Sequence, residues 1–220
     1  MSNISVAITD AILCLVLTIL VVKLYTKHKK SSDRNFVKLS CLFFIASALG
    51  AISGTVYHAL ENKFSDRVLF YLWFPVKYSL ALSAYCTAKV VTDSLLTKNC
   101  KKFMSTLIYS KTLFYCGFVY NIRSFLPTAI DFGSTIIFAI VLCLAKIKQA
   151  PHSVLLLFGW VFALSGVLWQ VSKFAISDLF FDHNDAFHTL AAVSSVFVYF
   201  GMNKYLRSLD EHLIINEDKV

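Results

Sequence analysis

Charged residues are scarce in this sequence: Asp, Glu, Lys and Arg make up 15% of the 220 residues, whereas 57% are hydrophobic. Soluble domains usually carry about 25% charged residues, so this balance argues against an ordinary soluble protein. The apolar residues also run on for roughly 20 positions at a time, the length that a helix needs to cross a hydrocarbon core of about 30 Å. The composition therefore predicts an all-α, polytopic membrane protein.

Several familiar motifs are also missing. The sequence has no P-loop, no G-x-G-x-x-G, no G-x-S-x-G and no internal repeat. Its six cysteines form no C-x-x-C pair, and most of them fall inside apolar runs, where cysteine behaves as a small hydrophobic residue. The N-terminus lacks the basic region and the small-residue cleavage site of a signal peptide, so we expect the first apolar run to be retained.

Seven apolar runs are long enough to be membrane spans. They cover about residues 4–25, 37–60, 67–95, 103–121, 125–146, 153–176 and 186–206. A count of six stays open, because only Asn121, Arg123 and Pro127 separate the fourth run from the fifth, and the two can also form one broken span. We expect a seven-transmembrane helix bundle over residues 1–208 and a short charged cytoplasmic tail over residues 209–220.

Basic residues gather in alternate connections. They lie in the first, third and fifth connections and after the last run: Lys23, Lys27, Lys29, Lys30, Arg34, Lys38, Lys98, Lys101, Lys102, Lys146, Lys148, Lys204 and Arg207. The other connections and the N-terminus are neutral to acidic, so the positive-inside rule predicts the N-terminus outside and the C-terminus in the cytoplasm. The net charge of +8 then follows from topology and contact with anionic headgroups, and nucleic acid is not an expected partner. We expect membrane lipids as partners, in a bacterial inner membrane or an organelle membrane, with the oligomeric state open.

Polar residues within the apolar runs concentrate at the depth of the predicted outer leaflet. They are Asp10, His58, Lys77, Asp131, Gln170, Lys173, Asp185 and His188. Ionisable groups are costly in a membrane, so each needs a partner or a function. Lys173 and Asp185 lie close enough to the ends of their runs to reach the interface, and Asp10 is either solvated or inside the bundle. Lys77 and Asp131 lie deeper, and they either pair with each other or face a water-filled cavity.

Two apolar runs carry a histidine on a face with small residues. Ala46, Gly50, Gly54 and His58 recur every four residues, which places them on one helix face and predicts that this face packs closely against a neighbour. In the last run, His188 lies one turn after Asn184. Because both histidines belong to the same leaflet, we expect them to share a site. Two imidazoles with a carboxylate and water suit zinc, and the candidates for further ligands nearby are His183 and Asp185.

The segment NDAFH, residues 184–188, resembles the N-D-x-[FY]-H motif that opens the last span in a group of uncharacterised bacterial seven-span membrane proteins. The arrangement is also distantly similar to the seven-span membrane hydrolase superfamily of alkaline ceramidases and progestin and adipoQ receptors. That superfamily has S-x-x-x-H in span two, an aspartate around span three and H-x-x-x-H in the last span, which together build a zinc site with a catalytic water. The corresponding residues here are Gly54, His58, Asp66, Asn184 and His188, so the serine and one histidine are replaced.

Two classes of function remain open. The resemblance implies hydrolysis of a lipid amide or ester by a metal-bound water, with an aspartate, Asp66, as general base. His58 and His188 would hold the zinc, with a third ligand from Asp66, His183 or Asp185, of which the resemblance favours Asp66. The alternative is a non-catalytic receptor, lipid-binding protein or small transporter with a lipid-like ligand, working through hydrogen bonds and histidine protonation. The expected ligand-binding residues are Asn184, Asp185, Lys77 and Asp131, of which the last two lie near the midplane, where transporter sites are common. A structural membrane protein is a third possibility, and whether the chain is an enzyme stays open.

Overall fold

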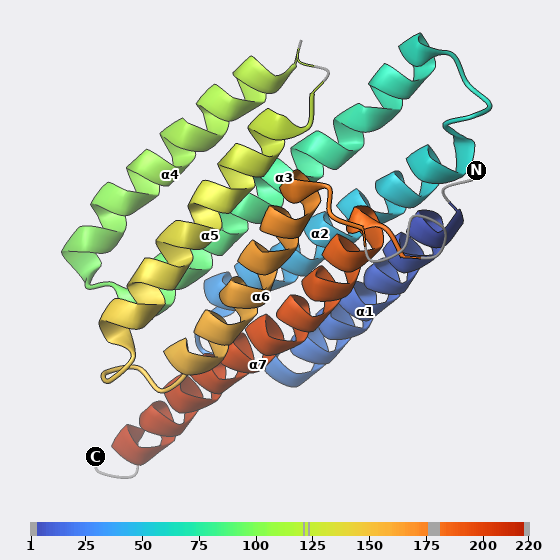
Figure 1. Cartoon of the computed structure of the whole chain (residues 1–220). Helices are drawn as coiled ribbons and strands as arrows, with labels where there is room; N and C mark the ends of the chain where they lie inside the picture. The colour runs from blue at the N-terminus through green and yellow to red at the C-terminus, as the bar shows by residue number, and fades with distance from the viewer. Residues whose placement is uncertain (1–3, 121, 123, 176–180, 218–220) are drawn as a thin grey trace.

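The structure, a computed structural model, describes residues 4–120, 122, 124–175 and 181–217, without the side chains of residues 212–217. These residues form seven helices: α1 (Ile4–His28), α2 (Arg34–Leu60), α3 (Asp66–Leu95), α4 (Lys98–Val119), α5 (Leu126–Lys146), α6 (Ser153–Ser172) and α7 (His183–Glu217) (Figure 1). The predicted all-helical class is confirmed, and each helix coincides with one apolar run. The fourth and fifth runs are separate helices, although Asn121 and Arg123 lie outside the described residues.

Four helices, α1, α2, α5 and α6, are long and apolar enough to cross a membrane. The other three, α3, α4 and α7, carry more charged residues along their length. The helices are therefore those of a membrane protein, whereas the number of spans and the orientation stay predictions. The helix α7 continues to Glu217, past the predicted domain boundary at residue 208.

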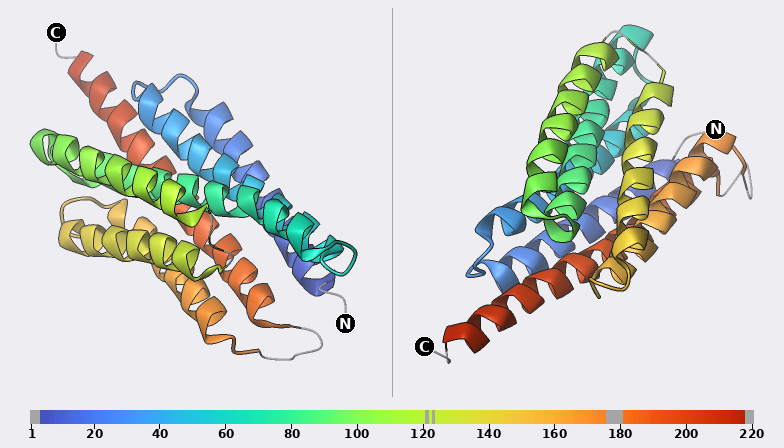
Figure 2. Two further views of the ribbon diagram at one scale, coloured as in Figure 1. Left: turned by 90° about the horizontal axis from the view of Figure 1, so that it is seen from above. Right: turned by 90° about the vertical axis from the view of Figure 1, so that its left-hand side faces the viewer.

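Six of the helices form a closed ring. Each of α1, α2, α3, α5, α6 and α7 packs against the next in that order, and α7 packs back against α1. The remaining helix, α4, lies outside the ring and packs mainly against α3 (Figure 2). Because α4 takes no place in the ring, α3 and α5 become neighbours across it. This ring determines which side chains can meet in the interior.

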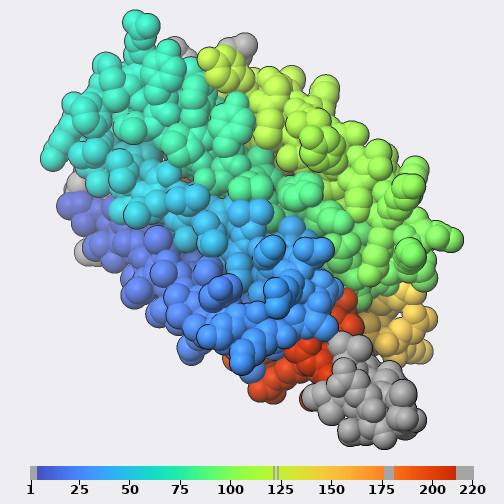
Figure 3. All heavy atoms as spheres, turned by 180° about the vertical axis from the view of Figure 1, so that it is seen from behind, coloured from blue at the N-terminus to red at the C-terminus, as the bar shows by residue number. Residues whose placement is uncertain are grey.

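The first helix shows how the sequence divides between interior and exterior. Leucines recur on its buried face at alternating spacings of four and three residues: Leu13, Leu17, Leu20 and Leu24. The opposite face exposes large aliphatic side chains, including Ile8, Ile12 and Ile19. An exposed apolar surface of this extent is typical of contact with lipid. Figure 3 shows α1 to α4 forming most of one face of the molecule.

Small residues allow a close contact between α6 and α7. A Cβ atom at Gly159 would lie 3.0 Å from the backbone nitrogen of Val198, and one at Gly201 would lie 2.7 Å from the Leu156 side chain. Glycine at both positions therefore lets the two helices approach closely, as small residues do in membrane helix packing. The approach fixes the position of the N-terminal half of α7 relative to α6.

Candidate functional site

The ring encloses a cavity of about 370 Å³. All six ring helices contribute to its wall, whereas none of the lining residues belongs to α4. The polar and charged lining residues are Asp10, Ser47, His58, Glu61, Gln170, Asn184, His188, Ser194 and Ser195. The rest of the wall is apolar and includes Phe43 and Trp160. Along α2 the wall extends from Phe43 to Glu61, about 27 Å at 1.5 Å per residue, with the charged groups at the outer end.

The histidine at the start of α7 is the centre of a buried polar cluster. His188 Nε2 lies 3.1 Å from Asp10 Oδ1, and its Nδ1 lies 3.2 Å from the Thr9 hydroxyl. That hydroxyl donates a hydrogen bond of 2.8 Å to Asp185 Oδ1, and the Val6 carbonyl oxygen also lies within 3.1 Å. The Asp185 carboxylate and the Val6 carbonyl are both acceptors, so the single hydroxyl proton of Thr9 is donated to them. The Thr9 oxygen is therefore the acceptor of a hydrogen bond from His188 Nδ1–H. Both ring nitrogens of His188 are therefore engaged.

Glycine at position 54 makes room for the Asp10 carboxylate. A Cβ atom at Gly54 would lie 2.6 Å from Asp10 Oδ2, closer than real Cβ contacts, so Asp10 occupies the space that a side chain on α2 would fill. The small-residue face of α2 thus packs against neighbours as predicted, with Gly54 against α1 and Gly50 against Ser79 of α3. This contact explains why glycine, without a side chain, stands at position 54.

A carboxylate just before α7 holds the helix start in place. Asp182 Oδ1 accepts hydrogen bonds from the backbone N–H groups of Asn184 (2.7 Å) and Asp185 (3.0 Å). Burial by itself raises the pKa of Asp182, but these hydrogen bonds and one from the Asn184 side chain outweigh it and hold the pKa below its ordinary value. The charged carboxylate therefore acts as a helix cap.

The same network orients Gln170 on α6. Asp182 accepts from Asn184 Nδ2, so Asn184 Oδ1 faces α6 and accepts a 2.7 Å hydrogen bond from Gln170 Nε2. This arrangement leaves Gln170 Oε1 buried with no hydrogen-bond partner in the described part of the chain. Asp10 Oδ2 and Trp160 Nε1 are in the same condition. His58 Nδ1 on the same wall also has no hydrogen-bond partner among the described residues. Buried polar atoms normally have a partner, so these four side chains could bind one in the cavity.

His58 lines the same cavity as His188, as their shared depth predicts. Its Nδ1 lies 3.6 Å from Glu61 Oε2, longer than a hydrogen bond, and its ring packs edge-on against Tyr57. The Tyr57 ring in turn packs against Trp73, with ring centroids 4.5 Å apart. Aromatic rings therefore flank the charged end of the cavity on the α2–α3 side.

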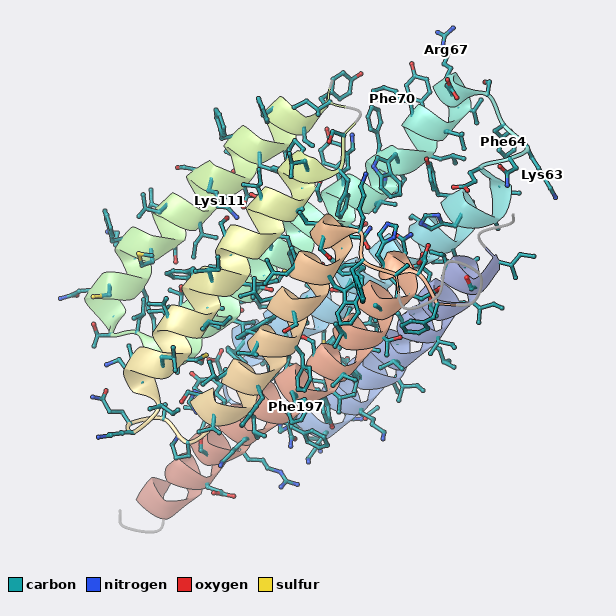
Figure 4. The ribbon with its side chains drawn as sticks, in the orientation of Figure 1. Lys63, Phe64, Arg67, Phe70, Lys111 and Phe197 are labelled. Atoms are coloured by element: carbon teal, nitrogen blue, oxygen red, sulfur yellow. The ribbon has the colours of Figure 1, made fainter. Side chains whose placement is uncertain are left out.

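The predicted catalytic aspartate lies elsewhere. Asp66 is exposed in the first turn of α3 and lines a second, smaller cavity with Tyr57 and Trp73. The connection between α2 and α3 extends past the bundle, as the positions of Lys63, Phe64 and Arg67 show (Figure 4). Asp66 comes directly after this connection, at the end of α3 that extends past the bundle. It therefore does not line the larger cavity, which contains His188.

Two other residues at the start of α7 also differ from expectation. Asp185 does not extend to the interface but is fully buried, because Thr9 and the backbone N–H of Asp182 donate to its carboxylate. Asp185 does not line the cavity. His183 is half-buried and does not line the cavity. Lys173 is exposed, in agreement with its predicted position at the end of its run.

Lys77 and Asp131 do not pair with each other, which is one of the two alternatives expected for them. Lys77 is fully buried, donates to the backbone carbonyl oxygen of Ile122, and has its Nζ 5.7 Å from the ring centre of Phe70. Asp131 instead pairs with Lys111 of α4 at 2.9 Å. Figure 4 shows Lys111 between α4 and α5. Neither Lys77 nor Asp131 lines the cavity, because both side chains point to the side of the bundle where α4 packs.

The residues present do not fit the predicted zinc site. His188 has a partner on each ring nitrogen, and Asp66 and His183 do not line the cavity. A catalytic zinc usually takes three protein ligands, whereas here only His58 retains a nitrogen without a hydrogen bond. Within the part of the chain that the structure describes, no three His, Cys, Asp or Glu side chains form a group that could hold a metal ion.

The comparisons with known proteins identify a family for this chain, but that family has no known activity. No curated protein and no solved structure matches the chain, so the distant similarity to the ceramidase and receptor superfamily receives no support from them. Residues 5–207 match a protein family described as a family of unknown function, DUF6962. The match includes all seven helices except the first residue of α1 and the C-terminal part of α7 after residue 207, and it includes every residue that lines the cavity. The chain therefore belongs to the DUF6962 family of unknown function.

Proposed function

We propose that this chain is an integral membrane protein that binds one amphiphilic molecule inside its helix ring, without catalysing a reaction. The observation that carries the proposal is the cavity of about 370 Å³ with charged and amide groups at one end and an apolar wall beyond them. This volume falls within the roughly 300–1,000 Å³ range of small-molecule pockets. The unpartnered atoms of Asp10 and Gln170 give a polar head group its contacts, and the remaining wall suits an apolar tail.

The arrangement of the helices supports a topology with seven spans and an outer cavity mouth. Successive helices alternate in direction, so the basic first, third and fifth connections lie at the same end of the bundle as the C-terminus (Figure 1). By the positive-inside rule this end is cytoplasmic. The charged end of the cavity lies at the opposite end, beside the start of α7 and the end of α2. An amphiphile in the outer leaflet would therefore have its head group at the right depth.

Hydrolysis of a lipid is supported less well by the same geometry. The implied mechanism needs a general base and a metal-bound water next to each other. Asp66 and His188, however, line different cavities. The hydroxyl of Thr9 donates to Asp185, and the hydroxyls of Thr189 and Ser195 on α7 donate to backbone carbonyl oxygens of that helix. A binding role, in contrast, needs no rearrangement of the side chains that line the cavity.

A cavity-filling variant tests the proposal. Ala163 of α6 is buried and lines the cavity, so Ala163→Leu places an isobutyl group where the apolar tail would lie. The matched control is Ala145→Leu on the exposed surface of α5. Binding of ten-carbon amphiphiles to protein in lipid nanodiscs is followed by tryptophan fluorescence, since Trp160 and Trp73 are on the wall.

We expect saturable binding of at least one amphiphile by the wild type and by Ala145→Leu. For Ala163→Leu we expect binding weakened by roughly tenfold or more, because a filled site costs the ligand its apolar contacts. Equal binding by both variants, or no saturable binding of any amphiphile tested, would contradict the proposal. Turnover of an ester or amide amphiphile by purified protein would contradict its non-catalytic part.

A further inference from the structure

We infer that the head group of the bound amphiphile is a protonated amine, held between Asp10 Oδ2 on α1 and Gln170 Oε1 on α6. The inference rests on the proposed binding function and names the class of its ligand. The two oxygen atoms belong to different helices but line the same cavity, and both are buried acceptors without a partner in the described structure. Asp10 is 3% exposed, so its free oxygen has no access to bulk water.

The side chains that carry the two acceptors are held by neighbouring residues of α7. Asp10 is held by His188 and Gln170 by Asn184, and these two residues are one helical turn apart. The two residues of α7 therefore hold the acceptors on neighbouring parts of the wall. One nitrogen atom that donates two hydrogen bonds of about 2.9 Å bridges acceptor oxygens that lie within about 5 Å of each other. An ammonium group has three N–H donors and satisfies both oxygens at once, whereas a single hydroxyl has one.

The charge of the lining excludes an anionic head group. Among the described residues that line the cavity, the carboxylates are Asp10 and Glu61, and neither lysine nor arginine is present. The only basic side chains on the wall are His58 and His188, which lie beside these carboxylates. Trp160 Nε1–H is a neutral donor on the wall, and with two carboxylates and no lysine or arginine among the described lining residues, a carboxylate or a phosphate would be repelled.

Aromatic side chains support the same assignment. Tyr57 and Trp73 line the cavity at the level of His58, and Trp73 also packs 6.0 Å from Phe125. Faces of tyrosine and tryptophan attract ammonium groups, with about 0.5–2 kcal/mol per contact in general, and they accept the alkyl part next to the nitrogen equally well. The acceptors and the rings thus favour a cation that also carries N–H donors.

Four probes with a ten-carbon chain separate the possible head groups: n-decylamine, n-decanol, decanoate and decyltrimethylammonium. Binding to the full chain in nanodiscs of neutral lipid is measured by tryptophan fluorescence and by calorimetry at pH 7. We expect n-decylamine to bind tightest, and decyltrimethylammonium roughly tenfold more weakly because it is a cation without N–H donors. Decanol should bind more weakly still, and decanoate should not bind at the site.

Variants then assign the contact. Asp10→Asn removes the charge at nearly constant size and should weaken n-decylamine roughly tenfold to a hundredfold, with little effect on decanol. Gln170→Leu removes the second acceptor at a half-buried position and should weaken n-decylamine several-fold, which keeps the test open if Asp10→Asn does not fold. Asp93→Asn is the matched control: it makes the same substitution near the C-terminal end of α3, outside the cavity. This variant should bind n-decylamine as the wild type does.

Each result has a defined meaning. Decanol or decanoate binding as tightly as n-decylamine overturns the amine assignment and leaves the amphiphile-binding function standing. Binding of n-decylamine that is unchanged in both Asp10→Asn and Gln170→Leu also overturns the assignment. Failure of all four probes contradicts the proposed function itself.

Discussion

Substituting Gly54 by alanine perturbs the contact between α2 and the buried carboxylate of α1. The added methyl group would lie 2.6 Å from Asp10 Oδ2, 3.2 Å from Cγ and 3.3 Å from Oδ1. All three carboxylate atoms are affected, so rotating the group does not relieve the contact. Asp10 must move away, and its 3.1 Å contact with His188 Nε2 is lost or lengthened.

Two opposing contributions determine the expected change in the free energy of unfolding. Replacing glycine by alanine inside a helix stabilises a protein by about 0.4–1 kcal/mol. Losing a buried hydrogen bond to a charged group costs about 1.5–3 kcal/mol. We therefore expect Gly54→Ala to lower the free energy of unfolding by roughly 1–2 kcal/mol. Gly50→Ala is the matched control, since its Cβ would lie 3.5 Å from Ser79 Cβ, an ordinary contact, and it should stabilise the protein slightly.

The free energy of unfolding of each variant is measured by denaturant titration in mixed lipid–detergent micelles. Adding Asp10→Ala removes the carboxylate that the methyl group would meet, so in that background Gly54→Ala should become neutral or stabilising. If Gly54→Ala were as stable as Gly50→Ala with Asp10 present, the close packing of α1 on α2 at this depth would be refuted. The same result would remove the reason given for glycine at position 54.

Two further predictions concern the bundle as a whole. A cysteine introduced at Asn62 should react with a membrane-impermeant reagent from outside and one at Asn99 should not, in a background without the native cysteines; the reverse pattern would invert the topology. In double-mutant cycles, Lys111→Met and Asp131→Asn should couple by roughly 0.5–1 kcal/mol, a value lowered by the partial exposure of Lys111, whereas Lys77→Met and Asp131→Asn should add independently. Coupling to Lys77 instead would favour the pair expected from depth alone.

Hydropathy alone identified the helices because a membrane span must satisfy its own backbone hydrogen bonds, and this condition acts locally along the chain. The seven apolar runs correspond to α1–α7, and the spacing of Gly50, Gly54 and His58 predicted the packed face of α2. Depth along the helix also predicted that His58 and His188 would line one cavity. Periodicity gives the depth and the face of a residue, and these inferences needed nothing more.

The partners of the buried polar groups were beyond the reach of periodicity. Asp10 was visible as an acid in the first run, but its partner His188 is 178 residues away, and only the closure of the ring by α7 against α1 brings them together. Thr9 and Gln170 gave no signal beyond being polar residues inside apolar runs. Lys77 and Asp131 have similar depths, yet they point towards different partners because α4 packs outside the ring.

The sequence by itself thus determined a chain of apolar helices, the positions of its polar residues along them, and a basic side and a neutral side. The tertiary structure alone decided which helices are neighbours, and through them that Asp10 meets His188 at a glycine of α2 while Asp66 remains outside the cavity. The physical reason is that lipid is as apolar as the side chains facing it, so hydrophobicity drives insertion but does not select neighbours. That selection depends on close packing at small residues and on hydrogen bonds between helices distant in sequence.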